Sequence, residues 1–170
     1  ARWHLGAKLA LVAAPFVAAA MLLIAATLWV SWQLDGGAAA LNEAGRMRMQ
    51  VYRLSLSVST GDSVAVAREV PGFESSLALL RDGDPQRPLF MPSDDTIRDR
   101  FAGINSEWKT FRDRWTVGGV DPAAGLRGEA SAFAAHADSL VTAIEAHLSR
   151  WTAVLHLLQA ALMALVVLGA

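Results

Sequence analysis

Residues 133–159 read FAAHADSLVTAIEAHLSRWTAVLHLLQ. Apolar side chains recur in this segment at steps of four and three residues, which is the repeat of one face of an α-helix. Charged residues interrupt the first half of the segment, and none follows Arg150. The segment therefore predicts one helix that begins in a polar domain and continues as an uncharged, apolar run. Its apolar stripe consists of Phe133, Ala137, Leu140, Ile144, Leu148, Trp151, Leu155 and Leu158.

The same repeat occurs three more times between residues 34 and 150, and no run of alternating β-branched residues occurs there. Four amphipathic helices joined by short connections form an antiparallel bundle, so we predict an all-α fold. The three further stripes are Ala44, Met47, Val51, Leu54 and Val58; Val66, Val70, Phe73, Leu77 and Leu80; and Ile97, Phe101, Ile104, Trp108, Phe111 and Trp115. The aromatic residues of the third stripe have the spacing of core positions rather than of a ligand box.

Turn-forming residues separate the stripes at 60–62, 81–88 and 117–122. The third helix is expected to begin after an N-cap at Ser93 or Asp94, and the fourth after Asp121 with Pro122 in the first turn. Pro71-Gly72 is expected to bend the second helix or to delay its start. Gly36-Gly37 is a candidate soft joint in the first helix.

Two apolar runs flank the polar segment. Leu9 to Val30 contains no charge over a length of about 33 Å as a helix, enough to cross a hydrocarbon core of about 30 Å. We predict a cytoplasmic stub at 1–8, a transmembrane helix at 9–32, a periplasmic bundle at 33–150 and a second, truncated span at 151–170. The alternative is a cleaved signal peptide ending at 38–40, although the apolar run is long for one.

The distribution of charge on either side of the first apolar run predicts how the chain is oriented in the membrane. Arg2 and Lys8 precede the first run and Asp35 is the first charge after it, which predicts a multi-pass protein of the bacterial inner membrane with its amino terminus in the cytoplasm. Membrane lipid is therefore an expected partner.

Composition narrows the function. The chain has 170 residues, 15 Lys plus Arg against 16 Asp plus Glu, 54% hydrophobic residues and no cysteine. The charge balance argues against a nucleic-acid partner. We find no catalytic motif, and His136 and His147 are too far apart along a helix to share a metal ion. We expect no catalytic residue, metal or cofactor within 1–170.

The segment Leu41 to Leu54 carries three arginines within eight positions. Glu43 can pair with Arg46, three residues on. Arg48 shares a stripe with Gly45 and Tyr52 at the border of the core face, where we expect it to have no partner in its own chain. One interpretation is a surface arginine whose stem covers apolar side chains.

The other interpretation requires a homodimer. If the first helices face each other across a two-fold axis, two Arg48 guanidiniums repel, and a small inorganic anion between them removes the repulsion. Gly45 would then leave room for the anion and Tyr52 would form a wall. Binding would favour the arrangement that brings the arginines together.

This segment resembles the P-box of the nitrate- and nitrite-responsive sensor histidine kinases (NarX/NarQ type). The matching residues are Asn42, Ala44, Gly45, Arg48, Met49, Gln50, Tyr52, Arg53 and Leu54. The resemblance continues more weakly through Phe73-Glu74, the loop 83–92, Trp108 and the stretch 133–159. Arg46-Met47 and Val51 depart from the pattern, and Glu43 stands where some members have Lys.

The resemblance implies a two-component sensor that binds nitrate or nitrite at the dimer interface through Arg48, with Arg53 in a supporting role. It also implies a HAMP linker and a histidine kinase after residue 170, which would use ATP and magnesium and act on a response regulator.

Two alternatives stay open. A related pattern occurs in the N-terminal domain of type IV pili chemoreceptors, which would make the chain the sensor of a methyl-accepting chemotaxis transducer. The alternative from another class is a membrane-anchored helical scaffold without signalling. The residues that follow position 170 would separate these possibilities.

Overall fold

The computed structural model describes residues 5–117 and 125–169. Within these ranges the regular elements are helices: α1 (Leu5–Ser59), α2 (Ser63–Asp82), α3 (Asp95–Arg112), the π-helical turn η1 (Asp113–Val117) and α4 (Leu126–Gly169). An isolated antiparallel bridge joins Asp84 to Leu89 in the loop between α2 and α3. The predicted all-α fold is confirmed.

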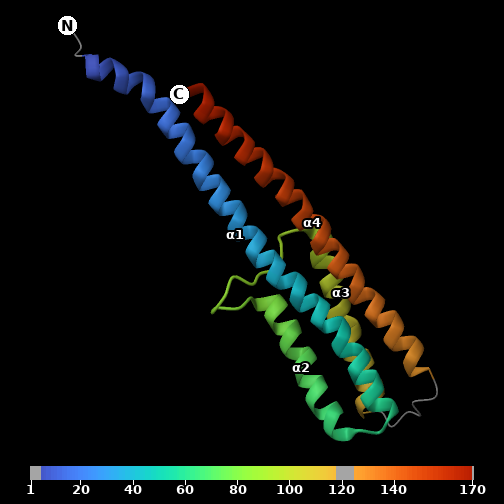
Figure 1. Cartoon of the computed structure of the whole chain (residues 1–170). Helices are drawn as coiled ribbons and strands as arrows, with labels where there is room; N and C mark the ends of the chain where they lie inside the picture. Colours follow the sequence, from blue (N-terminus) through green and yellow to red (C-terminus); the bar gives the residue numbers. More distant parts are fainter. Residues whose placement is uncertain (1–4, 118–124, 170) are drawn as a thin grey trace. The chain divides into compact units, whose positions relative to one another are not determined.

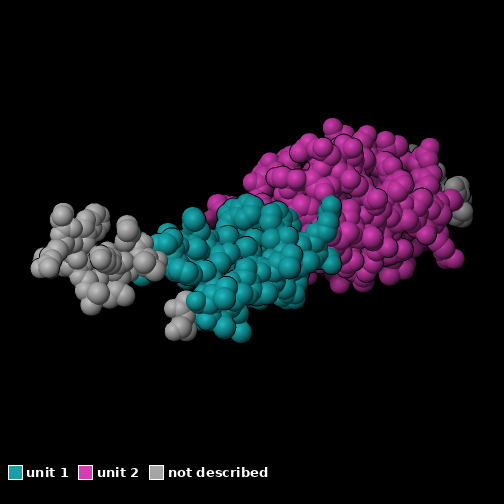
Figure 2. Space-filling model, turned by 90° about the horizontal axis from the view of Figure 1, so that it is seen from above, with its two compact units in different colours: residues 1–34, 149–170 teal, residues 35–148 magenta. Residues whose placement is uncertain are grey.

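The chain divides into two compact units, coloured separately in Figure 2. One unit comprises residues 1–34 and 149–170, and the other comprises residues 35–148. In the second unit the carboxyl-terminal part of α1 runs alongside α2, α3 and the amino-terminal part of α4, with successive helices in opposite directions (Figure 1). This is the predicted antiparallel bundle.

The apolar stripes form the core of this bundle. Met47, Val51, Ile97, Ile104 and Ile144 are fully buried, and the aromatic residues of the third stripe are buried with them. Burial at these positions follows from the helical repeat, because each helix turns the same side chains inward every three or four residues. Trp108, Phe111 and Trp115 are 3%, 6% and 6% exposed, which confirms that they are core residues.

The second stripe is offset from the prediction over its first half. Ala65 and Glu69 are buried, whereas Val66 and Val70 are only half-buried. The expectation that Pro71 delays the helix is wrong, because α2 begins at Ser63 and contains Pro71. The Asp62 side chain caps this start by accepting a hydrogen bond of 2.9 Å from the backbone N–H of Ala65.

The first helix has no break at its two glycines. α1 is helical through Gly36 and Gly37, and both residues are buried. An added Cβ would lie 2.2 Å from Phe90 Cε1 at Gly36 and 2.4 Å from Leu148 Cδ2 at Gly37. The helix continues through the predicted soft joint, and the two glycines allow close packing of α1 against neighbouring side chains.

Three further expectations concern helix ends and cleavage. Asp94, rather than Ser93, caps α3 by accepting from Thr96 N at 3.0 Å. The proposed caps Asp121 and Pro122 lie outside the described residues. Ala38 to Ala40, the cleavage site of the signal-peptide alternative, lie within α1, and Ala40 is fully buried.

The apolar segments lie in the first unit. Among the described residues, α1 and α4 are the two helices long and apolar enough to cross a membrane, and only 6% and 0% of their most apolar windows are buried. A core helix of a soluble protein would instead be mostly buried. Trp29 and Trp151 meet edge to face, with ring centroids 5.2 Å apart. The chain is accordingly a membrane protein, anchored by apolar helices.

The loop between α2 and α3 is fixed by Asp84. Its carboxylate accepts hydrogen bonds from Gln86 N at 2.9 Å and from Arg87 Nε at 2.8 Å, while Asp84 N donates to Leu89 O at 3.2 Å. Gly83, with φ of 80°, ends α2 just before this turn, and a Cβ there would lie 2.9 Å from Leu89 O. The turn is thus held by its own hydrogen bonds, and Leu89, which follows it, is buried.

We expect Ile104→Ala to lower the free energy of unfolding by about 2–5 kcal/mol, because it removes a fully buried side chain and leaves a cavity. Thermal and urea denaturation of the detergent-solubilised chain, followed by circular dichroism, measures the change. Val64→Ala is the control, since Val64 is 78% exposed and its loss should change the free energy by less than about 0.5 kcal/mol. Equal effects of the two substitutions would contradict the assignment of Ile104 to the core.

Asp84 should make the stability of the bundle depend on acid pH. The hydrogen bonds from Gln86 and then from Arg87 lower the pKa of the Asp84 carboxyl below its ordinary value of 3.8. A lowered folded-state pKa contributes stability above pH 3.8 and loses it as the pH falls through the folded value. The difference in melting temperature between the native chain and Asp84→Asn should therefore shrink as the pH falls below 3.8.

The matched control for this measurement is Asp99→Asn, an exposed carboxyl on α3. A difference between the native chain and Asp84→Asn that stays constant from neutral pH to about pH 2.5 would show that the Asp84 carboxylate does not stabilise the loop.

Candidate functional site

Two apolar faces run along the bundle part of α1. The core face contains Met47, Val51 and Leu54, which are at most 1% exposed. The second face, here called the outer stripe, consists of Gly45, Met49, Tyr52 and Leu56, at steps of four, three and four residues. Met49, Tyr52 and Leu56 are 50%, 48% and 64% exposed. Among the described residues, no atom outside the adjoining turns of α1 lies within 4 Å of a Cβ added at Gly45.

Arg48 lies between these two faces, as the sequence predicts. The expectation that it lacks a partner is wrong, because Arg48 Nη1 lies 2.5 Å from Asp138 Oδ1 on α4. The two side chains are 43% and 54% exposed, so this is a surface ion pair. Asp138 is separated from Arg48 by 90 positions in the sequence, and no local pattern identifies it as the partner.

The other residues proposed for the anion site divide between two sides of α1. Gly45, Arg48 and Tyr52 are brought to one side, while Arg53 is turned about 140° from Arg48, at 100° per residue. The side chain of Arg53 is exposed, and its carbonyl accepts a hydrogen bond of 2.9 Å from the hydroxyl of Ser57. A single anion that contacts Arg48 does not contact Arg53 of the same chain.

A buried polar network joins α1 to α2, and the sequence predicted only one of its contacts. The pair of Glu43 and Arg46 is confirmed, with 2.7 Å between Arg46 Nη2 and Glu43 Oε1. Arg46 also donates to Ser76 Oγ at 3.1 Å, and Ser76 Oγ donates to Gln50 Oε1 at 3.1 Å. Arg87 approaches Glu43 Oε2 at 3.9 Å. Gln50 and Glu43 therefore face α2, away from Arg48.

The burial of Glu43 bears on the proposed anion site. Its side chain is 4% exposed and lies against Arg46 and Arg87, so its charge is balanced inside the bundle. The acid that departs from the resembled pattern consequently does not project into the outer stripe. Asp138, on α4, is the acid that competes with an anion for Arg48.

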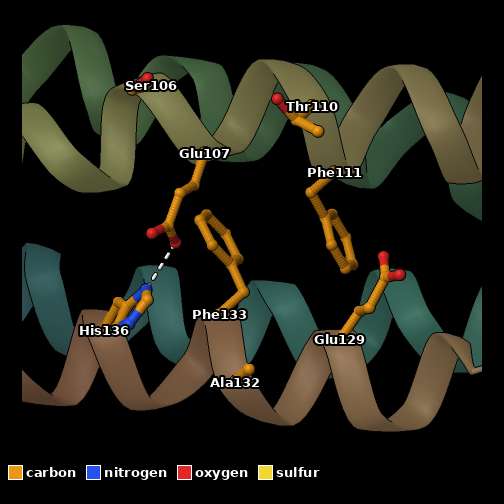
Figure 3. A pocket seen from close by; sticks show the side chains of 8 residues that line it. All are labelled: Ser106, Glu107, Thr110, Phe111, Glu129, Ala132, Phe133 and His136. Atoms are coloured by element: carbon orange, nitrogen blue, oxygen red, sulfur yellow. Dashed lines mark hydrogen bonds and ion pairs between the residues drawn. The ribbon is translucent and has the colours of Figure 1, made fainter.

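A pocket of about 360 Å³ lies between α3 and α4, and the sequence reasoning missed it. Figure 3 shows the rings of Phe111 and Phe133 standing between the two helices, with Glu107 directed at His136. Glu107 Oε2 lies 2.5 Å from His136 Nδ1. The sequence hint to this pocket is the spacing of Phe133 and His136, which puts both side chains on one side of α4. Only the packing of α3 against α4 shows that Glu107 faces His136. The lining residues are Ser106, Glu107, Thr110, Phe111, Glu129, Ala132, Phe133 and His136.

The described residues contain no group of three or more side chains that could hold a metal ion. His147 Nδ1 lies 3.4 Å from Asp94 Oδ2, whereas His136 contacts Glu107, so the two histidines have different partners. Both histidines therefore make contacts between helices.

Comparison with known proteins gives one family. The model described as the N-terminal region of type IV pili methyl-accepting chemotaxis transducers (PilJ) matches residues 29–137. This range takes in the outer stripe, the buried network and the residues of the α3–α4 pocket up to His136. No curated protein matches the chain.

Proposed function

Because this chain belongs to the type IV pili methyl-accepting chemotaxis transducer N-terminal family, we propose that it is the input domain of a membrane-anchored chemotaxis transducer. The observation that carries the proposal is the extent of the match, residues 29–137, which covers most of the bundle. An input domain requires no catalytic residue of its own. Its work is to change shape when a ligand binds and to pass the change to the rest of the protein.

The helices support this role. α1 and α4 each combine an apolar segment and a bundle segment in one helix. A ligand that moves the bundle part of such a helix by 1–2 Å would move its apolar part as well, because a helix transmits axial shifts. We propose that the chain lies in the bacterial inner membrane with the bundle in the periplasm, as the positions of Arg2, Lys8 and Asp35 favour.

We further propose that the protein works as a homodimer through the outer stripe. Three large apolar side chains spaced along one helix, each about half exposed or more, favour pairing with the same stripe of a second copy. Gly45 would let the two helices approach closely at its position, since nothing occupies the space beside it.

The proposed ligand of the Arg48 site is a small inorganic anion, with nitrate or nitrite as the first candidates. What supports this is the pattern of residues 42–54 and the position of Arg48 beside the outer stripe. The ion pair with Asp138 opposes it, because an anion must displace or share that carboxylate. A nitrate-responsive histidine kinase remains the second candidate for the whole protein, and the same residues are its support.

The dimer can be tested by cysteine cross-linking, because the chain has no cysteine of its own. Tyr52→Cys should form an intermolecular disulfide in membranes after mild oxidation, since the outer stripes of two copies would bring these positions together. Non-reducing gel electrophoresis measures the cross-linked fraction.

Asp99→Cys is the matched control, as an exposed position on α3 away from the outer stripe. We expect it to stay monomeric under the same oxidation. Equal cross-linking at both positions, or cross-linking at Asp99 alone, would rule out the proposed dimer interface.

The input role can be tested with a hybrid receptor. The chain is joined at residue 170 to the cytoplasmic signalling part of a methyl-accepting receptor, and receptor methylation and kinase activity are measured with and without nitrate. We expect nitrate to change both readouts, Arg48→Ala to abolish the response, and Asp138→Asn to lower the nitrate concentration needed, because it removes the competing carboxylate.

Two outcomes separate the parts of this proposal. A hybrid that inserts and dimerises, yet leaves kinase activity equal to that of a receptor without an input region, contradicts the input role. A hybrid that controls the kinase but ignores nitrate contradicts the nitrate proposal and leaves the input role standing.

A further inference from the structure

The α3–α4 pocket is an open, solvent-facing hollow with the size of a site for a small organic molecule. Its volume of about 360 Å³ falls at the lower end of the range for ligand sites. Both helices that line it belong to the same compact unit, residues 35–148. The side chains around it are aromatic on the inner side and polar on the outer side, which is the arrangement that holds a ligand with one apolar and one polar end.

The apolar wall is fixed before any ligand arrives. The rings of Phe111 and Phe133 lie 5.3 Å apart and 13° from parallel. Trp108 supports them from behind, with ring centroids 6.4 Å from Phe111 and 6.2 Å from Phe133. Phe111 and Phe133 are 6% and 4% exposed, so they offer a ligand a small, fixed area of aromatic ring. Aromatic rings attract a cation as well as an apolar group.

The charges of the pocket select the sign of the ligand. The lining contains two carboxylates, Glu107 and Glu129, and one base, His136. Both oxygens of Glu129 are engaged, one by Arg114 and the other by Trp115 Nε1 at 2.6 Å. The Glu129 carboxylate is therefore held in place and its charge is offset by Arg114. It disfavours an anion in the pocket, but both of its oxygens are already occupied and do not bind the ligand.

Glu107 is the anchor that remains. Its side chain is 44% exposed and contacts His136 through Oε2. A carboxylate has about four lone-pair directions, so a ligand N–H can bind Glu107 while His136 keeps its contact. Figure 3 shows Glu107 beside Phe133, which places the carboxylate next to the aromatic wall.

We propose that the α3–α4 pocket binds a small primary ammonium ion with an aromatic or short alkyl body. The ammonium donates to Glu107, and the apolar body packs on Phe111 and Phe133. Ser106 and Thr110 supply hydroxyls on the α3 side of the pocket. Such a ligand contacts both helices at once and favours one spacing between them. That this spacing is an input signal rests on the proposed function, whereas the binding itself does not.

The ligand class differs from that of the Arg48 site. An anion suits a guanidinium, but two carboxylates in one pocket disfavour it. The two sites also use different parts of the bundle, since Arg48 is on α1 and pairs with Asp138, outside the pocket lining. Failure of one site therefore leaves the other untouched.

Calorimetric titration of the whole chain in detergent tests the proposal with three probes of similar shape. Benzylammonium should bind in a saturable manner, whereas benzyl alcohol and benzoate should bind at least about tenfold more weakly, because they lack the positive charge. Glu107→Gln should weaken benzylammonium binding about tenfold or more, since it removes the charge while keeping the shape of the side chain.

Asp99→Asn is the matched control, because it removes a carboxylate of α3 that does not line the pocket. It should bind benzylammonium like the native chain. Circular dichroism confirms that each variant is folded.

Three results would overturn the proposal. The first is no saturable binding of benzylammonium up to about 10 mM, which would make the pocket a solvent-filled surface groove. The second is equal binding of benzoate, and the third is native affinity in Glu107→Gln. None of these results bears on whether the hybrid receptor controls its kinase, so the input role is judged separately.

Discussion

An amphipathic helix is held in place by the apolar surface that it removes from water, and α1 carries two such surfaces. The rest of the bundle covers one of them, where Met47, Val51 and Leu54 are buried against the other helices. In the outer stripe, Met49, Tyr52 and Leu56 stay 50%, 48% and 64% exposed within the described part of the chain. α1, which begins in an apolar segment, therefore keeps a second apolar face exposed along the bundle, and this exposed face is the physical basis of the proposed dimer.

The contact between α1 and α2 and the contact between α3 and α4 use different side chains. α1 meets α2 through a chain of polar contacts in which Arg46, Ser76 and Gln50 are linked at 3.1 Å. Hydrogen bonds have narrow distance and angle ranges, and a buried group left without its partner is costly, so this contact resists sliding. α3 meets α4 through the stacked rings of Phe111 and Phe133 and also through polar contacts, Glu107 with His136 and Arg100 with the carbonyl of Ser139 at 2.7 Å. These polar contacts are exposed, whereas Ser76 and Gln50 of the α1–α2 contact are buried.

Charged residues near Arg48 show how packing alters a functional interpretation. The sequence places Glu43 close to the arginine, where an acid would oppose an anion. The structure turns Glu43 into the bundle beside Arg46 and brings Asp138 to Arg48 instead. The opposing charge is present but comes from another helix, and it is exposed, where ion pairs are weak and exchange with solvent ions easily. An anion at the proposed Arg48 site would have to displace or share the Asp138 carboxylate.

The sequence by itself determined the helices, most of the core and several helix ends, because these depend on residues three or four positions apart. Met47, Phe73, Ile104 and Ile144, one from each stripe, are buried as the repeat requires, and the pair of Glu43 and Arg46 forms within one turn of α1. Gly36 and Gly37 show the limit of such reasoning. The sequence of a glycine pair is the same whether it makes a helix flexible or lets another side chain pack closely against it, as Phe90 and Leu148 do here.

Only the tertiary structure decided which faces meet. The partners Arg48 and Asp138, Gln50 and Ser76, and Glu107 and His136 are 90, 26 and 29 positions apart in the sequence. Their contacts depend on the rotation of each helix about its axis, and a rotation of one residue, 100°, exchanges one set of neighbours for another. The hydrophobic repeat fixes that rotation only to within the width of an apolar stripe, so polar partners and the pocket appear only when the helices are packed.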